Sequence, residues 1–392
     1  MPGPLEGVRV LDLSTMISGP LATMLLADQG ADVIKVESPG IGDLMRYLGS
    51  HRNGVTGLFA NNNRGKRSIV VDLKEPRGVE ILKQLAASAD VLVQNFRPGA
   101  MTRLGLGYDD LAAVNPRLIY VSISGFGSTG PYSTRRVYDN VIQAYAGYAG
   151  VQTNPATGEP AVFRTLVCDK ATAYTAAQAI TAALFARERG SAEGQHIELA
   201  MLDAGIAFLW PDAAMDRALL EDDTARQPTI GSNYQVTRLQ DGYVVASAIS
   251  DSEFAGYCAA LGQPEIAEDP RFRTLPDRMA HLADLLTTMR EATASALVEP
   301  FLESAFANDV PAAPILTLDD LPADAQVSHN EVFVEREHPQ AGRMREARPA
   351  PRFSSTPATL GAPAPTVGLH SDEIVAELGL DPAELRAAGI IA

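Results

Sequence analysis

The 392-residue chain has few of the residues that build disulfide or metal sites. Its two cysteines, Cys168 and Cys258, give no disulfide framework and no metal-binding spacing, and its six histidines show no paired HxxxH spacing. No apolar run approaches the roughly 20 residues that cross a bilayer, and the opening MPGPLEGVRVLDLS has neither a basic leader nor an apolar signal core. We therefore expect a cytoplasmic protein with no metal site and no membrane partner.

The charge is strongly negative but uneven along the chain. A formal net charge of −16 argues against a nucleic-acid partner. Residues 1–140 hold 15 lysines and arginines against 13 aspartates and glutamates, whereas residues 141–392 hold 17 against 35. An anionic ligand is therefore expected to bind to the first part of the chain.

Short β-branched runs alternate with helical stretches in the first half of the sequence. Such alternation predicts an α/β fold with a Rossmann-like parallel sheet and helices on both faces. The junction STMISGP lacks the GxGxxG spacing, so no dinucleotide site is expected. The strands are expected at 8–14, 31–37, 67–73, 90–96, 118–124 and 194–200, with helices near 76–88 and 170–188.

The length predicts at least two domains. We expect a large Rossmann-like domain over 1–224 and a smaller α+β domain over 225–325, which contains helices near 252–262 and 279–307. Residues 326–392 would return to the large domain. Their Pro-, Ala- and Arg-rich part, 337–368, is expected to be extended, and HSDEIVAELGL to close as a short helix.

Two basic stretches and one glycine-rich loop are candidate ligand sites. NNNRGKRS (61–68) and QNFRPGAMTRLGLG (94–107) place arginine or lysine near predicted strand ends, where open α/β sheets bind ligands and where such side chains suit phosphates. Solvated surface charge is the alternative. SGFGSTGPY (124–132) follows a strand and allows close backbone approach to a ligand, but ordinary turns have the same composition.

Asp169 begins an alanine-rich helical stretch and has two interpretations. A carboxylate at a helix N-terminus caps unpaired backbone N–H groups. The same position keeps the carboxylate ionised, so it could also act as a nucleophile. Position alone leaves both open.

Together these stretches resemble the class III CoA-transferase family, which contains formyl-CoA transferase, carnitine CoA-transferase and α-methylacyl-CoA racemase. The resemblance covers nearly the whole chain. It rests on GVRVLDLS followed by GP at 19–20, GADVIKVESPGIGD, KRSI with DLK, QNFRPGA, SGFGSTGPY, the Asp169 helix, GQHIELAMLDA and HSDEIVAELGL.

The resemblance implies a two-domain subunit in an interlocked homodimer, and acyl-CoA and a carboxylic acid as substrates with no tightly bound cofactor. It also implies that Asp169 attacks the thioester, giving an aspartyl anhydride and then an aspartyl-CoA thioester. Oxyanion donors would have to stabilise these steps. The CoA contacts implied by the resemblance fall on Met16, Val71, Lys74, Asn95, Phe96, Ala100, Arg103, Arg136 and Met201.

The same family leaves other functions open. The similar racemases carry a histidine where this chain has Tyr138, in the segment YDNV that also supplies Asp139 as a candidate catalytic residue. Racemisation needs two acid/base groups, and tyrosine, with a pKa near 10, is a poor substitute for histidine, so CoA transfer is favoured. Asp251 is a candidate for the second racemase group. A non-catalytic acyl-CoA binding protein is the remaining alternative.

Some positions depart from formyl-CoA transferase. That enzyme has glutamine and tryptophan at positions matching Ile17 and Leu48, so oxalate is not implied and a larger or less polar acid is expected. Its glycine-rich lid loop has no counterpart between 220 and 260.

Overall fold

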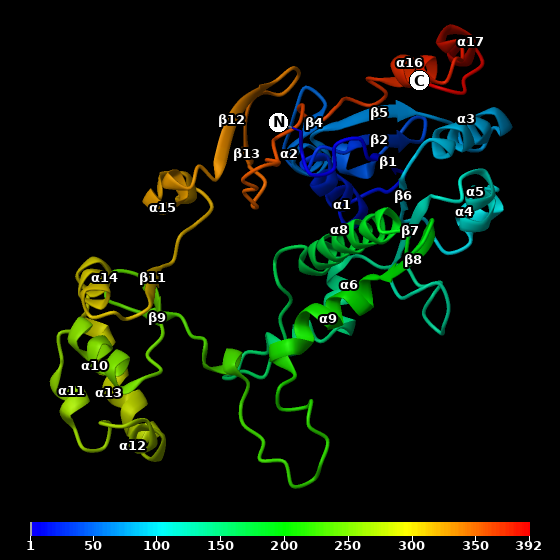
Figure 1. Ribbon diagram of the computed structural model, residues 1–392. Helices are drawn as coiled ribbons and strands as arrows, with labels where there is room; N and C mark the ends of the chain where they lie inside the picture. Colours follow the sequence, from blue (N-terminus) through cyan, green and yellow to red (C-terminus); the bar gives the residue numbers. More distant parts are fainter. Residues whose placement is uncertain (1) are drawn as a thin grey trace. The chain divides into compact units, whose positions relative to one another are not determined.

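The computed structural model describes residues 2–392 and contains two compact units (Figure 1). The larger unit runs to Thr224 and resumes at Glu331–Ala392, and the smaller unit is Ala225–Asn330. None of the helices among residues 2–392 is long and apolar enough to cross a membrane.

The larger unit is built on a six-stranded sheet in which every neighbouring pair is parallel. The strand order, β5-β2-β1-β6-β7-β8, reverses direction between β1 and β6, the point at which doubly wound sheets bind ligands. The predicted Rossmann-like parallel sheet is confirmed. Its strands are β1 (Arg9–Asp12), β2 (Asp32–Glu37), β5 (Lys66–Val70), β6 (Val91–Gln94), β7 (Ile119–Ser124) and β8 (Gln195–Ala200).

The central strands are apolar because both faces of the sheet are covered. Val10 and Leu11 are neighbours on β1, are both fully buried, and belong to two different cores. One core packs against α1 (Ser18–Ala27) and α8 (Val167–Glu188), and the other against α3 (Pro76–Ala87) and α16 (Ser371–Glu377). Successive side chains of a strand point to opposite faces, so continuous apolar runs are required here.

The remaining helices of this unit connect the strands. Alanines of α8 are buried in the same core as residues of α1, and these two helices contact each other closely. The connecting elements are η1 (Leu44–Tyr47), α2 (Gly57–Asn63), α4 (Ala100–Arg103), α5 (Tyr108–Val114), α6 (Asp139–Tyr145), α7 (Tyr148–Val151) and α9 (Met201–Ala213), together with the two-stranded β3 (His51–Arg52) and β4 (Val55–Thr56).

The smaller unit has its own three-stranded antiparallel sheet and its own core around Phe254, Phe272 and Phe301. The helix expected near 252–262 is α10 (Asp251–Ala260). The helix expected over 279–307 is wrong as one element, because extended backbone at Ala296 and Leu297 divides it. The elements are β9 (Thr237–Arg238), β10 (Tyr243–Ala246), β11 (Ala312–Pro314), η2 (Ile230–Asn233), η3 (Leu321–Ala323), α11 (Glu265–Glu268), α12 (Leu275–Ala280), α13 (Leu282–Ser295), α14 (Val298–Ala307) and α15 (Ala325–His329).

The C-terminal part differs from the expectation of an extended segment. Part of it forms an antiparallel hairpin of β12 (Phe333–His338) and β13 (Gly342–Ala347). The closing helix of HSDEIVAELGL is confirmed as α16, and a further helix, α17 (Pro382–Ala387), follows with its N-terminus capped by Asp381.

Candidate active site

Asp169 lies in the first turn of α8 but does not cap it. The N-cap position is Leu166, which makes no side-chain capping bond. Instead, the backbone N–H of Asp169 donates to Oδ1 of Asp139 at 2.9 Å, so a residue from another helix supplies the acceptor. The interpretation of Asp169 as an N-cap is therefore wrong, because its carboxylate bonds elsewhere.

The Asp169 carboxylate contacts the start of α1. The hydroxyl of Ser18, the first residue of α1, donates a short hydrogen bond to Oδ1 of Asp169. Ser18 is 3% exposed and lies 151 positions away in the sequence. The N-terminal ends of two helices therefore meet at this carboxylate, and the partial positive charge at a helix N-terminus stabilises an anion.

The environment of Asp169 raises its pKa. Burial is the largest cause, and the negative charge of Asp139 adds to it, whereas the hydrogen bonds from Ser18 oppose it, leaving a pKa of about 6. The carboxylate is therefore ionised at neutral pH yet partly desolvated. Such a carboxylate is more reactive than a fully solvated one, as a nucleophile requires.

The other groups around Asp169 are held in place or are chemically inert. Gln143 donates to Oδ2 of Asp139 at 2.5 Å and accepts from the Phe163 N–H at 2.8 Å, which fixes Asp139. Burial raises the pKa of Cys168 to about 12, so this thiol is neutral and is not a competing nucleophile.

A cavity of about 290 Å³ lies beside the N-terminus of α8. Tyr138, which is 67% exposed, lines this cavity together with Asp139. Arg164 contributes a cation to its lining. The structure thus brings Asp169 and Asp139 into direct contact and places Tyr138 at the adjacent surface.

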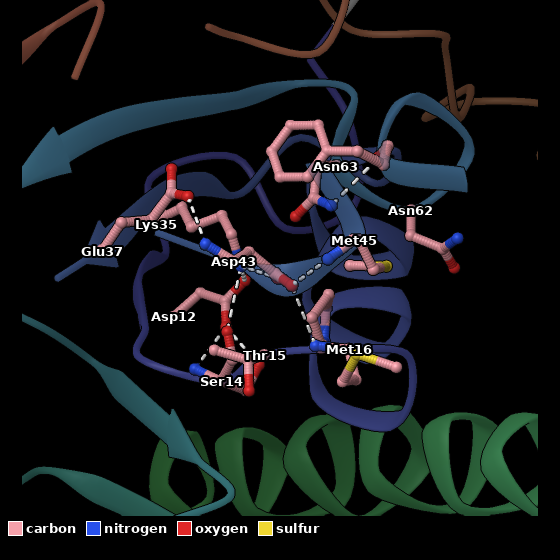
Figure 2. A network of polar contacts seen from close by, with 12 residues as sticks. Asp12, Ser14, Thr15, Met16, Lys35, Glu37, Asp43, Met45, Asn62 and Asn63 are labelled. Atoms are coloured by element: carbon pink, nitrogen blue, oxygen red, sulfur yellow. Dashed lines mark hydrogen bonds and ion pairs between the residues drawn. The ribbon is translucent and has the colours of Figure 1, made fainter. Parts of the chain in front are cut away.

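The loop between β1 and α1 is fixed by side chains from other elements. Lys35 donates to the Ser14 carbonyl at 2.9 Å, and Oδ1 of Asp43 accepts the Met16 N–H at 3.1 Å, as Figure 2 shows. Asn95 binds both backbone groups of Thr15, at 2.9 and 2.7 Å. These bonds hold Met16 in a left-handed conformation with φ 64° directly before α1.

A buried ion network supports this loop. Lys35 forms an ion pair with Asp43 at 2.9 Å, and Lys66 donates to Asp12 at 2.8 Å, all four side chains being fully buried. Although burial alone would raise the pKa of Asp12, the charges of Lys35 and Lys66 hold it well below its usual range. Burial lowers the pKa of Lys66 to about 8. Buried charges need such partners, and their geometry fixes one loop conformation.

The residues that the resemblance assigns to CoA follow several carboxyl ends of the parallel sheet. Asn95 and Phe96 follow β6, and Asn95 bonds the loop that contains Met16, so these three surround the switch point between β1 and β6. Ala100 and Arg103 lie on α4, and Lys74 is exposed after β5.

Three other positions lie differently. The side chains of Val71 and Met201 are 1% and 8% exposed and belong to the hydrophobic cores. Only their backbone or a small part of the side chain could meet a ligand. Arg136 is exposed in the segment between the glycine-rich loop and α6.

A second cavity, of about 490 Å³, opens at the carboxyl ends of β6, β7 and β8. Phe96 and residues 126–129 of the glycine-rich loop line it. Inside it, Ser122 lies 2.9 Å from Nε2 of His196 and accepts from Gln94 at 2.8 Å. The glycine-rich loop therefore borders a real cavity, next to the residues assigned to CoA.

The phosphate-binding interpretation of NNNRGKRS is wrong. Arg64 is 5% exposed and pairs with Asp28 at 2.7 Å, and Lys66 is committed to Asp12. Arg67 pairs with Asp32 and two glutamates of α16. Within the described chain these cations are paired with carboxylates and stabilise the fold.

Ile17 and Leu48 are the positions that bear on substrate size, and Asp251 is the one that bears on racemisation. Ile17 is 3% exposed, directly before α1, and Leu48 is 38% exposed after η1. Asp251, in the smaller unit, pairs with Arg278 at 2.7 Å. Among residues 2–392, no group of three or more His, Cys, Asp or Glu side chains could hold a metal ion.

Comparison with known proteins identifies the family. The model of CoA-transferase family III matches residues 5–371, so the chain belongs to this family, as the resemblance predicted. It is 37% identical to succinyl-CoA:glutarate CoA-transferase of Mus musculus, over 96% of this chain and 86% of that protein. It is 36% identical to succinate–glutarate CoA-transferase of Agrobacterium fabrum, over 96% of both. A crystal structure of a CAIB/BAIF family protein from Brucella suis matches with a TM-score of 0.84 at 33% identity, over 96% of this chain and 100% of that one.

Family membership establishes the class of enzyme. The chain is a CoA-transferase of family III, and the expected enzyme class is confirmed. Acyl-CoA thioesters and carboxylates are the substrates of such enzymes.

Sequence reasoning missed Ser18 and the buried network. The signal for the network is present in the sequence, because Asp12 and Lys35 interrupt otherwise apolar strands, and a charge in a strand buried on both faces must have a partner. Ser18 carries no such signal, since its contact with Asp169 exists only in the folded chain.

Proposed function

We propose that this protein transfers CoA from an acyl-CoA thioester to a carboxylic acid with Asp169 as the nucleophile. The observation that carries this proposal is the Asp169 carboxylate itself, which is partly desolvated, bound by Ser18 at the junction of two helix N-termini, and has a pKa of about 6. Asp139 supports it by accepting the Asp169 N–H and fixing the first turn of α8.

The reaction proceeds by two rounds of acyl exchange on Asp169. An Asp169 oxygen attacks the thioester carbonyl and releases CoA thiolate, which forms the aspartyl anhydride. The thiolate then attacks Cγ of Asp169, releasing the donor carboxylate and leaving an aspartyl-CoA thioester. The acceptor carboxylate then attacks Cγ of the aspartyl-CoA thioester and expels CoA thiolate, which forms a new anhydride. The thiolate attacks the acceptor's carbonyl in this anhydride, which yields the new acyl-CoA and releases the Asp169 carboxylate. Covalent catalysis divides one difficult exchange into easier steps.

The substrates that we propose are succinyl-CoA as donor and a short dicarboxylate such as glutarate as acceptor. Two of the relatives are a succinyl-CoA:glutarate and a succinate–glutarate CoA-transferase, which supports this choice. Arg164 lines the cavity beside the N-terminus of α8, where a guanidinium can bind the second carboxylate of a diacid. An Arg164→Gln variant should raise KM for glutarate and leave KM for a monocarboxylate unchanged.

For CoA itself we propose the positions assigned by the resemblance. Lys74, Arg103 and Arg136 are exposed cations suited to phosphates, and Phe96 is a half-exposed ring suited to adenine. Met16, Asn95 and Ala100 would contact the remainder of CoA, with Val71 and Met201 contributing mainly backbone. Tyr138, at the surface beside Asp139, would contact the substrate rather than carry a proton.

A homodimer and a cytoplasmic location are also part of the proposal. Tyr174 and Phe185 on α8, and Phe208 and Trp210 on α9, are between 53% and 67% exposed, although α8 and α9 pack together. Large apolar side chains gathered on adjacent helices favour burial against another protein, and the family resemblance points to a second copy of the chain. Light scattering of the purified protein would give twice the mass of one chain.

The test is to trap the covalent intermediate. The protein is incubated with succinyl-CoA or another thioester, quenched and digested, and the peptides are analysed by mass spectrometry. A modification confined to the Asp169 peptide is expected, which Asp169→Ala loses and Cys168→Ala keeps. Absence of any adduct with deuterium entering the α-position in heavy water would favour a racemase, and tight binding without exchange would favour a binding protein.

A further inference from the structure

Ser18 contacts the Asp169 carboxylate through both its hydroxyl and its backbone N–H. Its hydroxyl donates to Oδ1 of Asp169, and because it is 3% exposed, water does not compete for this bond. The backbone N–H of Ser18 also stabilises the Asp169 carboxylate and lowers its pKa. As the first residue of α1, Ser18 has no acceptor for this N–H within its own helix.

The charge on Oδ1 changes during the reaction. In the free carboxylate the two oxygens share the negative charge. In the anhydride and in the aspartyl-CoA thioester Oδ1 is a neutral carbonyl oxygen, and it becomes negative again in each tetrahedral intermediate formed at Cγ. When the thiolate sulfur bonds to Cγ, the electron pair of the Cγ–Oδ1 double bond moves onto Oδ1. Collapse restores the double bond and breaks the bond from Cγ to Oδ2, which leaves with the donor carboxylate. Attack of the acceptor carboxylate on the thioester follows the same path, with CoA thiolate leaving.

We propose that Ser18 is a catalytic residue whose hydroxyl stabilises the oxyanion on Oδ1 of Asp169 whenever Cγ of the acylated Asp169 is attacked. The inference rests on the proposed function, because it requires Asp169 to be acylated. A donor aimed at the place where charge develops stabilises the transition state more than the neutral anhydride or thioester before it.

The surrounding structure holds this donor in place before the reaction begins. The loop before α1 is bonded at Ser14, Thr15 and Met16 by Lys35, Asn95 and Asp43. A Cβ atom at Gly19 would come within 2.3 Å of the Ser14 Cβ, so the first turn of α1 is packed directly on this loop. Ser18 therefore needs little reorganisation when charge appears on Oδ1, which is what makes such a donor effective.

The Ser18 hydroxyl should act as an oxyanion donor in some steps of the reaction and not in others. The first attack, by Asp169 on the thioester, places the oxyanion on the substrate and not on Oδ1. Loss of the hydroxyl should therefore slow the attacks on Cγ, whereas the first attack loses no oxyanion donor. The anhydride should accumulate at the expense of the aspartyl-CoA thioester, an outcome that a purely structural role would not produce.

The experiment compares Ser18→Ala, Ser18→Thr and the wild type in rapid acid-quench reactions with succinyl-CoA, followed by mass measurement of the Asp169 peptide. Thr175→Ala is the control, because it removes a hydroxyl of the same helix as Asp169 that bonds only its own backbone at Ala171. We expect Ser18→Ala to lower turnover about 10²-fold, typical of losing one oxyanion donor, with the anhydride as the main adduct. Ser18→Thr and the control should keep the thioester as the main adduct.

Three other outcomes would each refute either the role of Ser18 or the proposed function. If Ser18→Ala keeps the wild-type ratio of the two adducts and turns over within about threefold of the wild type, the inference is wrong while Asp169 remains the nucleophile. Should Ser18→Thr fold, as judged by its melting curve, and still behave like Ser18→Ala, side-chain volume and not the hydroxyl is responsible, which also refutes it. Absence of any adduct on wild-type Asp169 would instead refute the proposed function.

Discussion

The backbone N–H of Asp169 donates to the carboxylate of Asp139 at 2.9 Å, so two carboxylates share the first turn of α8. A helix N-terminus tolerates this arrangement because its partial positive charge favours anions. The second carboxylate has a chemical effect as well, since its charge adds to burial in raising the pKa of Asp169. Asp139 therefore orients the proposed nucleophile and adjusts its ionisation.

The pH dependence of the reaction follows from this pair. Because Asp169 must be ionised to attack and has a pKa of about 6, the rate of adduct formation should fall about tenfold per pH unit below that value. Asp139→Asn keeps an oxygen for the Asp169 N–H but removes the neighbouring charge, so the acid limb should move to lower pH. Rates of adduct formation between pH 4.5 and 8 would show this. An acid limb that stays in place in Asp139→Asn would mean that the two carboxylates are not coupled.

The same raised pKa makes the ionised nucleophile costly for stability. The folded-state pKa of Asp169, about 6, lies above the ordinary value of 3.8, so the folded protein binds this proton more tightly than the unfolded chain does. The resulting penalty is fully present above pH 6 and disappears as the pH falls towards 3.8. Asp169→Asn should therefore unfold with a free energy about 1 kcal/mol higher than the wild type at pH 8, allowing for partial exposure of the group.

This gain in stability should shrink at acidic pH. Urea unfolding at pH 8 and at pH 4.5 measures the difference directly, with Asp203→Asn, on α9, as a substitution of the same kind elsewhere. A stabilisation of equal size at both pH values would show that the gain does not come from the charge on Asp169.

The fold was largely predictable because its strands are buried on both faces. Continuous runs of Val, Ile and Leu around Val10, Ile34, Leu92 and Val121 have no other place in a globular protein, and all six expected strands are present. The hairpin of β12 and β13 was missed because it is half exposed and rich in Arg and Glu, so its apolar alternation is weak. Pairs such as Glu335 with Arg343 stabilise it instead, and sequence patterns do not reveal them.

The contacts of the candidate site were predictable only in part. Asp169 stands at a recognisable junction of the sequence and remains a prediction as the nucleophile, whereas the phosphate site at 61–68 was wrong because the partners of Arg64 and Lys66 come from distant segments. Ser18, Lys35 and Asp43 act through tertiary contacts that have no sequence period. Long-range polar contacts of this kind are set by the arrangement of the strands, which local composition does not encode.

The Lys35–Asp43 pair beneath the β1–α1 loop should show strong energetic coupling. Both side chains are fully buried, so Lys35→Met leaves Asp43 unpaired and should cost about 3–5 kcal/mol of unfolding free energy. The double variant Lys35→Met/Asp43→Asn removes both charges and should cost less than the sum of the single variants, by about 0.5–3 kcal/mol. A double-mutant cycle in urea at pH 7 gives this coupling. Additive effects would mean that Lys35 and Asp43 act independently.

Variants of Arg103 and Arg64 should affect different properties, CoA binding in one case and the stability of the fold in the other. Arg103 is exposed on α4, whereas Arg64 is buried in a pair with Asp28. Arg103→Gln should weaken CoA binding by about 10- to 100-fold, because a hydrogen bond to a charged phosphate contributes about 1.5–3 kcal/mol, and should leave the melting temperature unchanged. Arg64→Gln should lower stability by about 3–5 kcal/mol and leave the affinity of the folded protein for CoA unchanged.

Calorimetric titration with CoA and with dephospho-CoA, together with melting curves, tests both arginines at once. If Arg103 contacts the 3′-phosphate, Arg103→Gln should bind the two ligands equally, whereas the wild type should prefer CoA. If it contacts the pyrophosphate, both ligands should lose affinity by the same factor. Wild-type affinity for both ligands would remove Arg103 from the CoA site. A loss of CoA affinity in folded Arg64→Gln would restore NNNRGKRS as a ligand-binding segment.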